Sequence, residues 1–306
     1  MRLLNASGCL DALTAPEVAG ELDAFVTKTV TPLPREGNAP VRIAETDVGM
    51  LNAIGLANPG IDEFSRRTLP RLASTLRRPI WVSVGGFSTR DYVEVCEQLE
   101  GREAVAAIEL NLSCPNVDEV PENVGEVVAA ARAATSEPLY AKLSPAIGDL
   151  AETARAAEAA GADGLSLVNT IKGLALDERT LQPVLARGAG GLSGPALRPI
   201  ALAAVHACYT AVEVPIVGMG GVATGRDVLE LLAAGARDVA LGTVLFADPD
   251  APTRVRSELE AELAAHGFAH PDNAVGAAHR NDGSTLNQRS RHGDKKHLHM
   301  GINMAG

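Results

Sequence analysis

Short apolar segments alternate with longer amphipathic segments along most of the chain. The short segments have the composition of strands and cover residues 2–6, 24–29, 80–84, 106–112, 139–143, 164–169, 215–219 and 239–242. The longer segments are rich in alanine, leucine and glutamate at helical spacing and cover residues 15–22, 61–76, 89–99, 122–135, 149–160, 196–209, 224–234 and 251–265. The pattern therefore predicts eight strand–helix units in series.

Units of this kind build a parallel sheet. Strands that are hydrophobic along their whole length are expected where helices cover both faces, and the helical crossovers force parallel pairing. Eight units close a (βα)8 TIM barrel, and 306 residues suffice for one such α/β domain. An open, doubly wound sheet uses the same units and is the alternative. We expect a single barrel domain over residues 1–266.

Two regions interrupt the pattern. Residues 30–60 are rich in proline and glycine and form a predicted loop that is too long to be a simple connection. Because this loop follows the second strand, we expect it on the catalytic rim of the barrel. Residues 267–306 are polar and contain five histidines, so we expect a disordered C-terminal tail, with weak metal binding as the alternative.

Composition and charge narrow the classes of partner. The formal charge is -11 and the pI is about 5.1, which disfavours binding to nucleic acid or to an anionic membrane surface. The sequence contains no signal-peptide pattern and no 18-residue apolar stretch, which predicts a cytoplasmic protein without a membrane segment. Four cysteines without CxxC spacing indicate free thiols and neither zinc nor disulfides.

Polar residues gather where the predicted strands end, and a (βα)8 barrel builds its active site at those ends. Lys28 and Lys142 lie within apolar strands, where an unpaired ammonium is costly to bury, so each is expected to face an anion or a polar ring. Side-chain amides suit the recognition of a ring that carries both carbonyl and N–H groups. The candidates for this role are Asn52, Asn111, Asn116 and Asn169.

Glycines follow the last strands. Gly220 and Gly221 come after the seventh strand, and Gly242 and Thr243 come after the eighth. The glycine-rich run 190–194 follows the sixth strand and can add further amides to the same corner. Exposed backbone N–H groups at these positions are where this fold commonly holds a phosphate, so we predict a phosphate site there.

One cysteine stands among the strand-end residues. Apart from Glu109, which precedes Asn111 in the fourth strand, these motifs contain no histidine, aspartate or glutamate. Cys114 is then the remaining group that can accept a proton. Cys96 and Cys208 lie in helical segments and are expected in the core, and Cys9 is also expected to pack rather than to line the site.

Four motifs, in order, carry a resemblance to a known family. The chain resembles the class 1 dihydroorotate dehydrogenases through GMLNAIGLANPG at 49–60, ELNLSCPNV at 109–117, GGLSGP at 190–195 and GMGG at 218–221. The likeness covers roughly residues 3–250. Within the class, the chain is most similar to the class 1B catalytic subunit, through residues 52–56, 169–170 and 246–249. Serine at position 83 is closer to the class 1A pattern.

The resemblance implies an FMN-dependent enzyme that oxidises (S)-dihydroorotate to orotate in pyrimidine biosynthesis. It implies that Cys114 removes the proton from C5 of the substrate while C6 delivers hydride to N5 of the flavin. The implied FMN contacts are Ser7, Lys28, Thr29, Ser83, Asn111, Lys142 and Val168, with the phosphate on Gly194, Gly220, Gly221, Gly242 and Thr243. The implied substrate contacts are Lys28, Asn52, Ala53, Ile54, Gly55, Leu56, Asn111, Asn116, Asn169 and Thr170.

The electron acceptor and the assembly stay open at this point. By resemblance, a class 1B enzyme is a heterotetramer that passes electrons to NAD through a partner subunit with FAD and a 2Fe–2S cluster, whereas a class 1A homodimer uses fumarate. The chain itself lacks a GxGxxG fingerprint and a typical cluster site. The other functions considered are a flavin dehydrogenase for dihydrouracil, a Schiff-base aldolase that uses Lys142 or Lys28, and a barrel that only binds a ligand.

Overall fold

The computed structural model describes residues 1–112, 123–146 and 148–280. Eight strands form one sheet in the order β1-β12-β11-β8-β7-β6-β5-β2, and all of their pairings are parallel. Their bounds are β1 (Leu3–Asn5), β2 (Phe25–Val26), β5 (Ile80–Val84), β6 (Val105–Asn111), β7 (Leu139–Leu143), β8 (Gly164–Leu167), β11 (Ile216–Met219) and β12 (Asp238–Leu241). A parallel bridge between Leu4 and Ala24 joins the two ends of this order, so the sheet closes into a barrel. This confirms the TIM barrel and excludes the open sheet.

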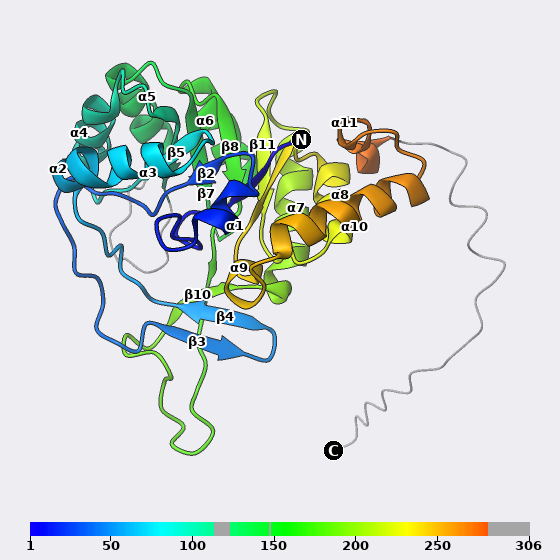
Figure 1. Ribbon diagram of the computed structural model, residues 1–306, viewed down its shortest axis with the longest axis horizontal. Coiled ribbons are helices and arrows are strands. Elements are labelled where there is room, and N and C mark those ends of the chain that lie inside the picture. The colour runs from blue at the N-terminus through cyan, green and yellow to red at the C-terminus, as the bar shows by residue number, and fades with distance from the viewer. Residues whose placement is uncertain (113–122, 147, 281–306) are drawn as a thin grey trace.

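Helices cover the outside of the barrel (Figure 1). They are α1 (Pro16–Gly20), α2 (Ile61–Glu63), α3 (Leu69–Thr75), α4 (Thr89–Leu99), α5 (Val124–Ala134), α6 (Leu150–Ala159), α7 (Arg198–Tyr209), α8 (Gly225–Ala234) and α10 (Ala251–Ala265), with a π-helical turn (Phe64–Thr68) between α2 and α3. Ser88 and Thr224 start α4 and α8, because each hydroxyl accepts a hydrogen bond from a backbone N–H three residues on. All eight predicted helical segments are therefore present. None of the described helices has the length and apolar character needed to cross a membrane.

The inside of the barrel is packed towards the amino ends of its strands. A buried cluster there consists of Leu4, Ala24, Val26, Trp81, Ala107, Tyr140, Val217, Met219 and Ala240. The rings of Trp81 and Tyr140 lie 4.3 Å apart between centroids, and the guanidinium of Arg2 lies 5.1 Å from the Trp81 ring. Because this layer fills the barrel, space for a ligand remains only towards the carboxyl ends of the strands.

A second, antiparallel sheet lies beside the carboxyl ends of the barrel strands (Figure 1). It consists of β3 (Ile43–Thr46), β4 (Gly49–Asn52), β10 (Gly190–Ser193) and β9 (Ile171–Gly173), in the order β3-β4-β10-β9. The sequence predicted only a long loop over residues 30–60. The pairing is not visible locally, because Met50 of β4 lies opposite Ser193 of β10, 143 residues later.

The beginning of the predicted tail is folded. Residues 271–274 form α11 (Pro271–Ala274), which contacts α8, and Asp272 accepts an ion-paired hydrogen bond of 3.1 Å from the N-terminal ammonium of Met1. The ring of His279 stacks on that of His206 in α7, with 3.9 Å between centroids. These contacts extend the folded domain beyond the expected boundary at residue 266 to residue 280. Residues 281–306 lie outside the described residues.

Candidate active site

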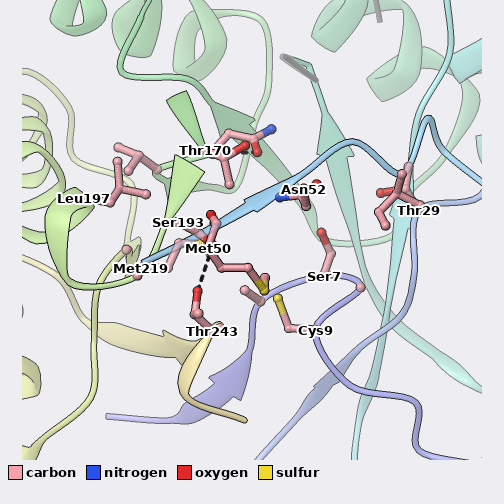
Figure 2. Close-up of a pocket in the computed structure, with 18 of the residues that line it drawn as sticks. Ser7, Cys9, Thr29, Met50, Asn52, Thr170, Ser193, Leu197, Met219 and Thr243 are labelled. Atoms are coloured by element: carbon pink, nitrogen blue, oxygen red, sulfur yellow. Dashed lines mark hydrogen bonds between the residues drawn. The ribbon is translucent and has the colours of Figure 1, made fainter. Parts of the chain in front are cut away.

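A pocket opens between the carboxyl ends of the barrel strands and the antiparallel sheet (Figure 2). It encloses about 1120 Å³ of empty space, a volume that includes the open solvent at its mouth. Most of the residues that the sequence proposed for the site meet in its lining. These are Ser7, Lys28, Thr29, Asn52, Ile54, Gly55, Leu56, Asn111, Lys142, Val168, Asn169, Thr170, Gly194, Gly220, Gly221, Gly242 and Thr243.

Four of the proposed residues are not in the described lining. Ser83 is fully buried behind the pocket wall, with its Oγ 3.0 Å from Oγ1 of Thr29. Ala53 is buried against Leu51 and Leu185. Ser83 and Ala53 therefore support lining residues and do not line the pocket themselves. Cys114 and Asn116 lie outside the described residues.

Lys142 is held by two partners at the pocket wall. Its Nζ donates a hydrogen bond of 2.9 Å to Oγ of Ser7, in the turn after β1. It also lies 3.4 Å from Oε1 of Glu109, with only 6% of the lysine side chain and 1% of the glutamate side chain exposed. Within the described residues, the anion that the sequence predicted for Lys142 is thus the Glu109 carboxylate.

Lys28 reaches the pocket past a glycine. A Cβ atom placed on Gly8 would lie 2.9 Å from Cδ of Lys28, so the turn after β1 passes the lysine side chain at the closest approach that glycine allows. The described lining contains these two lysines and neither aspartate nor glutamate. These two lysines are the charged groups of the described lining, and the charge of Lys142 is offset in part by Glu109 behind it.

A row of hydrogen-bonded side chains crosses the barrel top from β5 to the end of β8. Thr29 Oγ1 meets Ser83 Oγ and accepts a bond of 3.2 Å from Nδ2 of Asn111. Oδ1 of Asn111 in turn accepts a bond of 3.0 Å from Nδ2 of Asn169. The backbone N–H of Thr170 donates to Oδ1 of Asn169 at 2.8 Å. These bonds fix the orientation of both amides, so the row presents defined donors and acceptors to a ligand.

Backbone N–H groups gather at another part of the pocket. Within the described residues, none of the N–H groups of Gly194, Gly220, Gly221, Gly242 and Thr243 donates a hydrogen bond to the protein. Gly194 precedes the 3-10 turn (Pro195–Leu197) that leads into α7, and Thr243 precedes α9 (Val244–Ala247). Unbonded N–H groups at helix starts attract anions. The corner therefore offers the donors that the predicted phosphate site requires.

Gly221 shows why this corner depends on glycine. Its φ of +74° lies in the left-handed region, and a Cβ atom there would come within 2.7 Å of Cβ and 2.8 Å of the backbone N of Arg198. A side chain would both strain the backbone and push against the start of α7. Glycine leaves the backbone open towards the pocket.

The structure adds lining residues that sequence reasoning missed. Cys9, which was expected to pack, lines the pocket, and its side chain and that of Met50 point toward each other (Figure 2). Burial raises the pKa of the Cys9 thiol, and the positive charge of Lys142 opposes that rise. Ser193 lies inside the glycine-rich run 190–194, so its motif gave a signal, and its Oγ accepts a hydrogen bond of 2.9 Å from Thr243 Oγ1. Met50 had no such signal, because β4 was not predicted.

Acidic and thiol side chains do not form a metal centre in the part of the chain that the structure describes. There, no three His, Cys, Asp or Glu residues come together as potential ligands of one ion. The described residues give the pocket two lysines, a row of oriented amides and a corner of N–H groups that bond no other described residue.

Comparisons with known proteins agree with this site. The family model described as "Dihydroorotate dehydrogenase" matches residues 2–263. A protein named dihydroorotate dehydrogenase B (NAD(+)), catalytic subunit, from Desulforudis audaxviator is 45% identical over 274 residues, which cover 87% of this chain and 89% of that protein. A Solibacter usitatus protein provisionally named dihydroorotate dehydrogenase A (fumarate) is 44% identical over 262 residues, or 83% of this chain and 86% of that protein.

A solved structure shares the fold. A crystal structure of DHODH from Eimeria tenella in complex with ferulenol matches with a TM-score of 0.76 over 91% of this chain and 85% of that chain, at 23% sequence identity. The family match covers most of the barrel, and the curated relatives match over nearly their whole length. The chain therefore belongs to the dihydroorotate dehydrogenase family, the flavin-dependent oxidoreductases of pyrimidine biosynthesis, and is similar to its class 1B catalytic subunits.

Proposed function

We propose that this pocket binds FMN and oxidises (S)-dihydroorotate to orotate. The observation that carries the proposal is the meeting, in one pocket, of free N–H donors, two lysines and a row of oriented amides. A phosphorylated flavin needs the first, and a cyclic substrate with carbonyl, N–H and carboxylate groups needs the other two.

The residues present fit FMN. Its phosphate would accept hydrogen bonds from the N–H groups of Gly194, Gly220, Gly221, Gly242 and Thr243, where a Cβ on Gly221 would leave no room. The flavin ring system would be held by other residues of the pocket lining. These are Ser7, Lys28, Thr29, Asn111, Lys142 and Val168. Ser83 would act through its hydrogen bond to Thr29. When bound, FMN supplies the hydride acceptor of the reaction.

The substrate would be held by the residues that surround the amide row. Lys28 offers a charge for the carboxylate of dihydroorotate, and Asn52, Asn111, Asn169 and Thr170 offer donors and acceptors to its ring. Ile54, Gly55 and Leu56 line the same pocket, and buried Ala53 keeps their segment packed against the second sheet. By the family resemblance, Asn116 adds a further amide.

Cys114 is proposed as the base that takes the proton from C5 of dihydroorotate as hydride leaves C6. In support, Asn111 at the end of β6 lines the pocket, and Cys114 follows it by three positions. The described lining contains no histidine, aspartate or glutamate that could do this work. A thiol whose thiolate is accessible near neutral pH is a competent acceptor.

For reoxidation we propose the class 1B route, in which a partner subunit with FAD and a 2Fe–2S cluster passes electrons to NAD in a heterotetramer. The support is the name of the Desulforudis relative, a catalytic subunit of an NAD(+) enzyme. The name of the Solibacter relative specifies fumarate instead, which makes a fumarate-reducing homodimer the alternative. Co-purification with the co-expressed partner, followed by assays with NAD and with fumarate, separates the two.

The central test is anaerobic reduction of the bound flavin. Purified protein loaded with FMN should lose its yellow absorbance when dihydroorotate is added without any electron acceptor, and dihydrouracil should act far more slowly. A flavin that stays oxidised with dihydroorotate contradicts the proposal. Borohydride trapping of a carbonyl substrate on Lys142 would support an aldolase, but an ammonium paired with Glu109 is a poor nucleophile for that step.

A further inference from the structure

Glu109 and Lys142 form an ion pair that stands apart from the others. Among the ion pairs of the described residues, it is the only one with both side chains buried, at 1% and 6% exposure. Removing two charges from water costs more than such a pair usually returns, so stability alone does not account for it. The reaction proposed above gives Glu109 no role.

The position of Glu109 is one layer below the pocket. Glu109 and Asn111 are two residues apart in β6, so their side chains lie on the same face of the strand. Asn111 and Lys142 line the pocket, whereas Glu109 is absent from the described lining. Lys142 also bonds Ser7, so its ammonium is held by a carboxylate below and a hydroxyl at the pocket edge.

We propose that Glu109 is a positioning residue that fixes the ammonium of Lys142 against Ser7 and offsets part of its charge towards the flavin. The proposal rests on the proposed function for the identity of the ligand. Charged groups beside a flavin change the relative stability of its oxidised and reduced forms. With the carboxylate removed, the full charge of Lys142 faces the ligand and favours the reduced form, which carries more negative charge.

Three variants isolate the role of the carboxylate. Glu109→Gln removes the charge and keeps the size, and Glu109→Asp keeps the charge on a shorter side chain. Ser166→Ala is the matched control, because Ser166 is fully buried in β8, lies opposite Lys142 in register, and has an Oγ without a hydrogen-bond partner in the described residues. All three changes lie in the same part of the barrel, so a general packing effect would move them together.

The first measurement compares the dissociation constants of oxidised and reduced FMN. We expect Glu109→Gln to raise the preference for reduced FMN about tenfold, which is about 30 mV in the two-electron midpoint potential. Glu109→Asp should give a smaller change, and Ser166→Ala none. An unchanged preference in folded Glu109→Gln overturns the proposal.

The second measurement needs no flavin. Acetic anhydride acetylates accessible neutral amines, and mass spectrometry reports the rate at Lys142 in flavin-free protein. The loss of one hydrogen bond to a charged group corresponds to about a tenfold change. Lys142 should therefore be acetylated about tenfold faster in Glu109→Gln than in the wild type. In Ser166→Ala it should be acetylated at the wild-type rate. If Glu109→Gln does not fold, Glu109→Asp must show the faster reaction, and equal rates overturn the role. A wild-type protein that binds no FMN, together with faster acetylation in the variant, refutes the proposed function and retains the positioning role.

Discussion

Asn169 donates a hydrogen bond of 3.0 Å from Nδ2 to Oδ1 of Asn111, across the space between the ends of β8 and β6. The contact joins two residues that are 58 positions apart in the chain. Because Asn111 bonds Thr29 on its other side, the loss of Asn169 would free one end of the row and remove a donor from the pocket.

Asn169→Ala should therefore lower kcat/KM for dihydroorotate by roughly thirtyfold, the equivalent of about 2 kcal/mol for a polar group left without its partner. Steady-state assays with an artificial acceptor measure it. Asn273→Ala is the matched control, because Asn273 is an exposed asparagine in α11 that does not line the pocket. This variant should retain full activity. A variant at position 169 that works as well as the control would show that the amide row does not contact the substrate.

Gly221→Ala should weaken FMN binding at least about tenfold, since a left-handed non-glycine residue costs about 1–2 kcal/mol before its contact with Arg198 is counted. Quenching of FMN fluorescence during titration gives the dissociation constant. Gly101→Ala is the control, because Gly101 also has a positive φ of +65° but no atom within 4 Å of an added Cβ. Equal weakening in both variants would trace the effect to backbone strain instead of the phosphate corner.

The hydrogen bonds of Glu100 should make the stability of the folded protein depend on pH in the acid range. Its carboxylate accepts hydrogen bonds from the hydroxyl of Ser136, the hydroxyl of Thr135 and the backbone N–H of Ser136, which lower its pKa from 4.5 to about 2. Because the folded pKa lies below the unfolded one, the stabilisation is complete above pH 4.5 and is lost as the pH falls through about 2.

Glu100→Gln should accordingly lower the urea midpoint at pH 6 and converge with the wild type as the pH approaches 2. Glu97→Gln, in α4 three residues before Glu100, which caps the C-terminus of that helix, removes a carboxylate that accepts no hydrogen bond among the described residues. It should change the midpoint little at either pH. A deficit of Glu100→Gln that is the same at pH 6 and near pH 2 would argue against the hydrogen-bonded carboxylate as its cause.

Cys114→Ser should slow the anaerobic reduction of FMN by dihydroorotate at least about tenfold at neutral pH, because a serine hydroxyl is a much poorer base than a thiol with a reference pKa of about 8.5. Stopped-flow absorbance measures the rate. Cys208→Ala is the control, because the Cys208 thiol of α7 lies in the core and not in the pocket. Its burial raises its pKa to about 11. A rate in Cys114→Ser equal to that of the control would move the base to another residue.

The barrel could be predicted because its strands are buried on both sides. Every residue of Ile80–Val84 is buried, and such runs stand out in a sequence. The antiparallel sheet could not be predicted in the same way, since Ile43–Thr46 alternates between exposed and half-buried positions and its neighbours are set by pairing far along the chain. The folded segment over 271–280 was missed because a few contacts, such as that of Asp272 with Met1, anchor it without an apolar pattern.

The site could be predicted in outline for a geometric reason. Residues that end parallel strands of a barrel must share one rim, so Lys142, Asn111 and Thr243 meet whatever loops connect them. The sequence does not show as simply which of these side chains reach the pocket and which lie behind its wall. Ser83 lies on a strand in the expected place, but its hydroxyl points to Thr29 and not into the pocket, and only the three-dimensional packing reveals this.

The pairing of β1 with β12, the first and last strands of the barrel in the chain, has a consequence for how the protein acquires its cofactor. Arg2 bonds Asp238, 236 positions later, so a ribosome must synthesise nearly the whole barrel before its first and last strands can meet. The proposed phosphate corner is completed later still, at Gly242 and Thr243. FMN would then load only after translation has passed this point, and its binding would favour the closed barrel over partly folded chains by mass action.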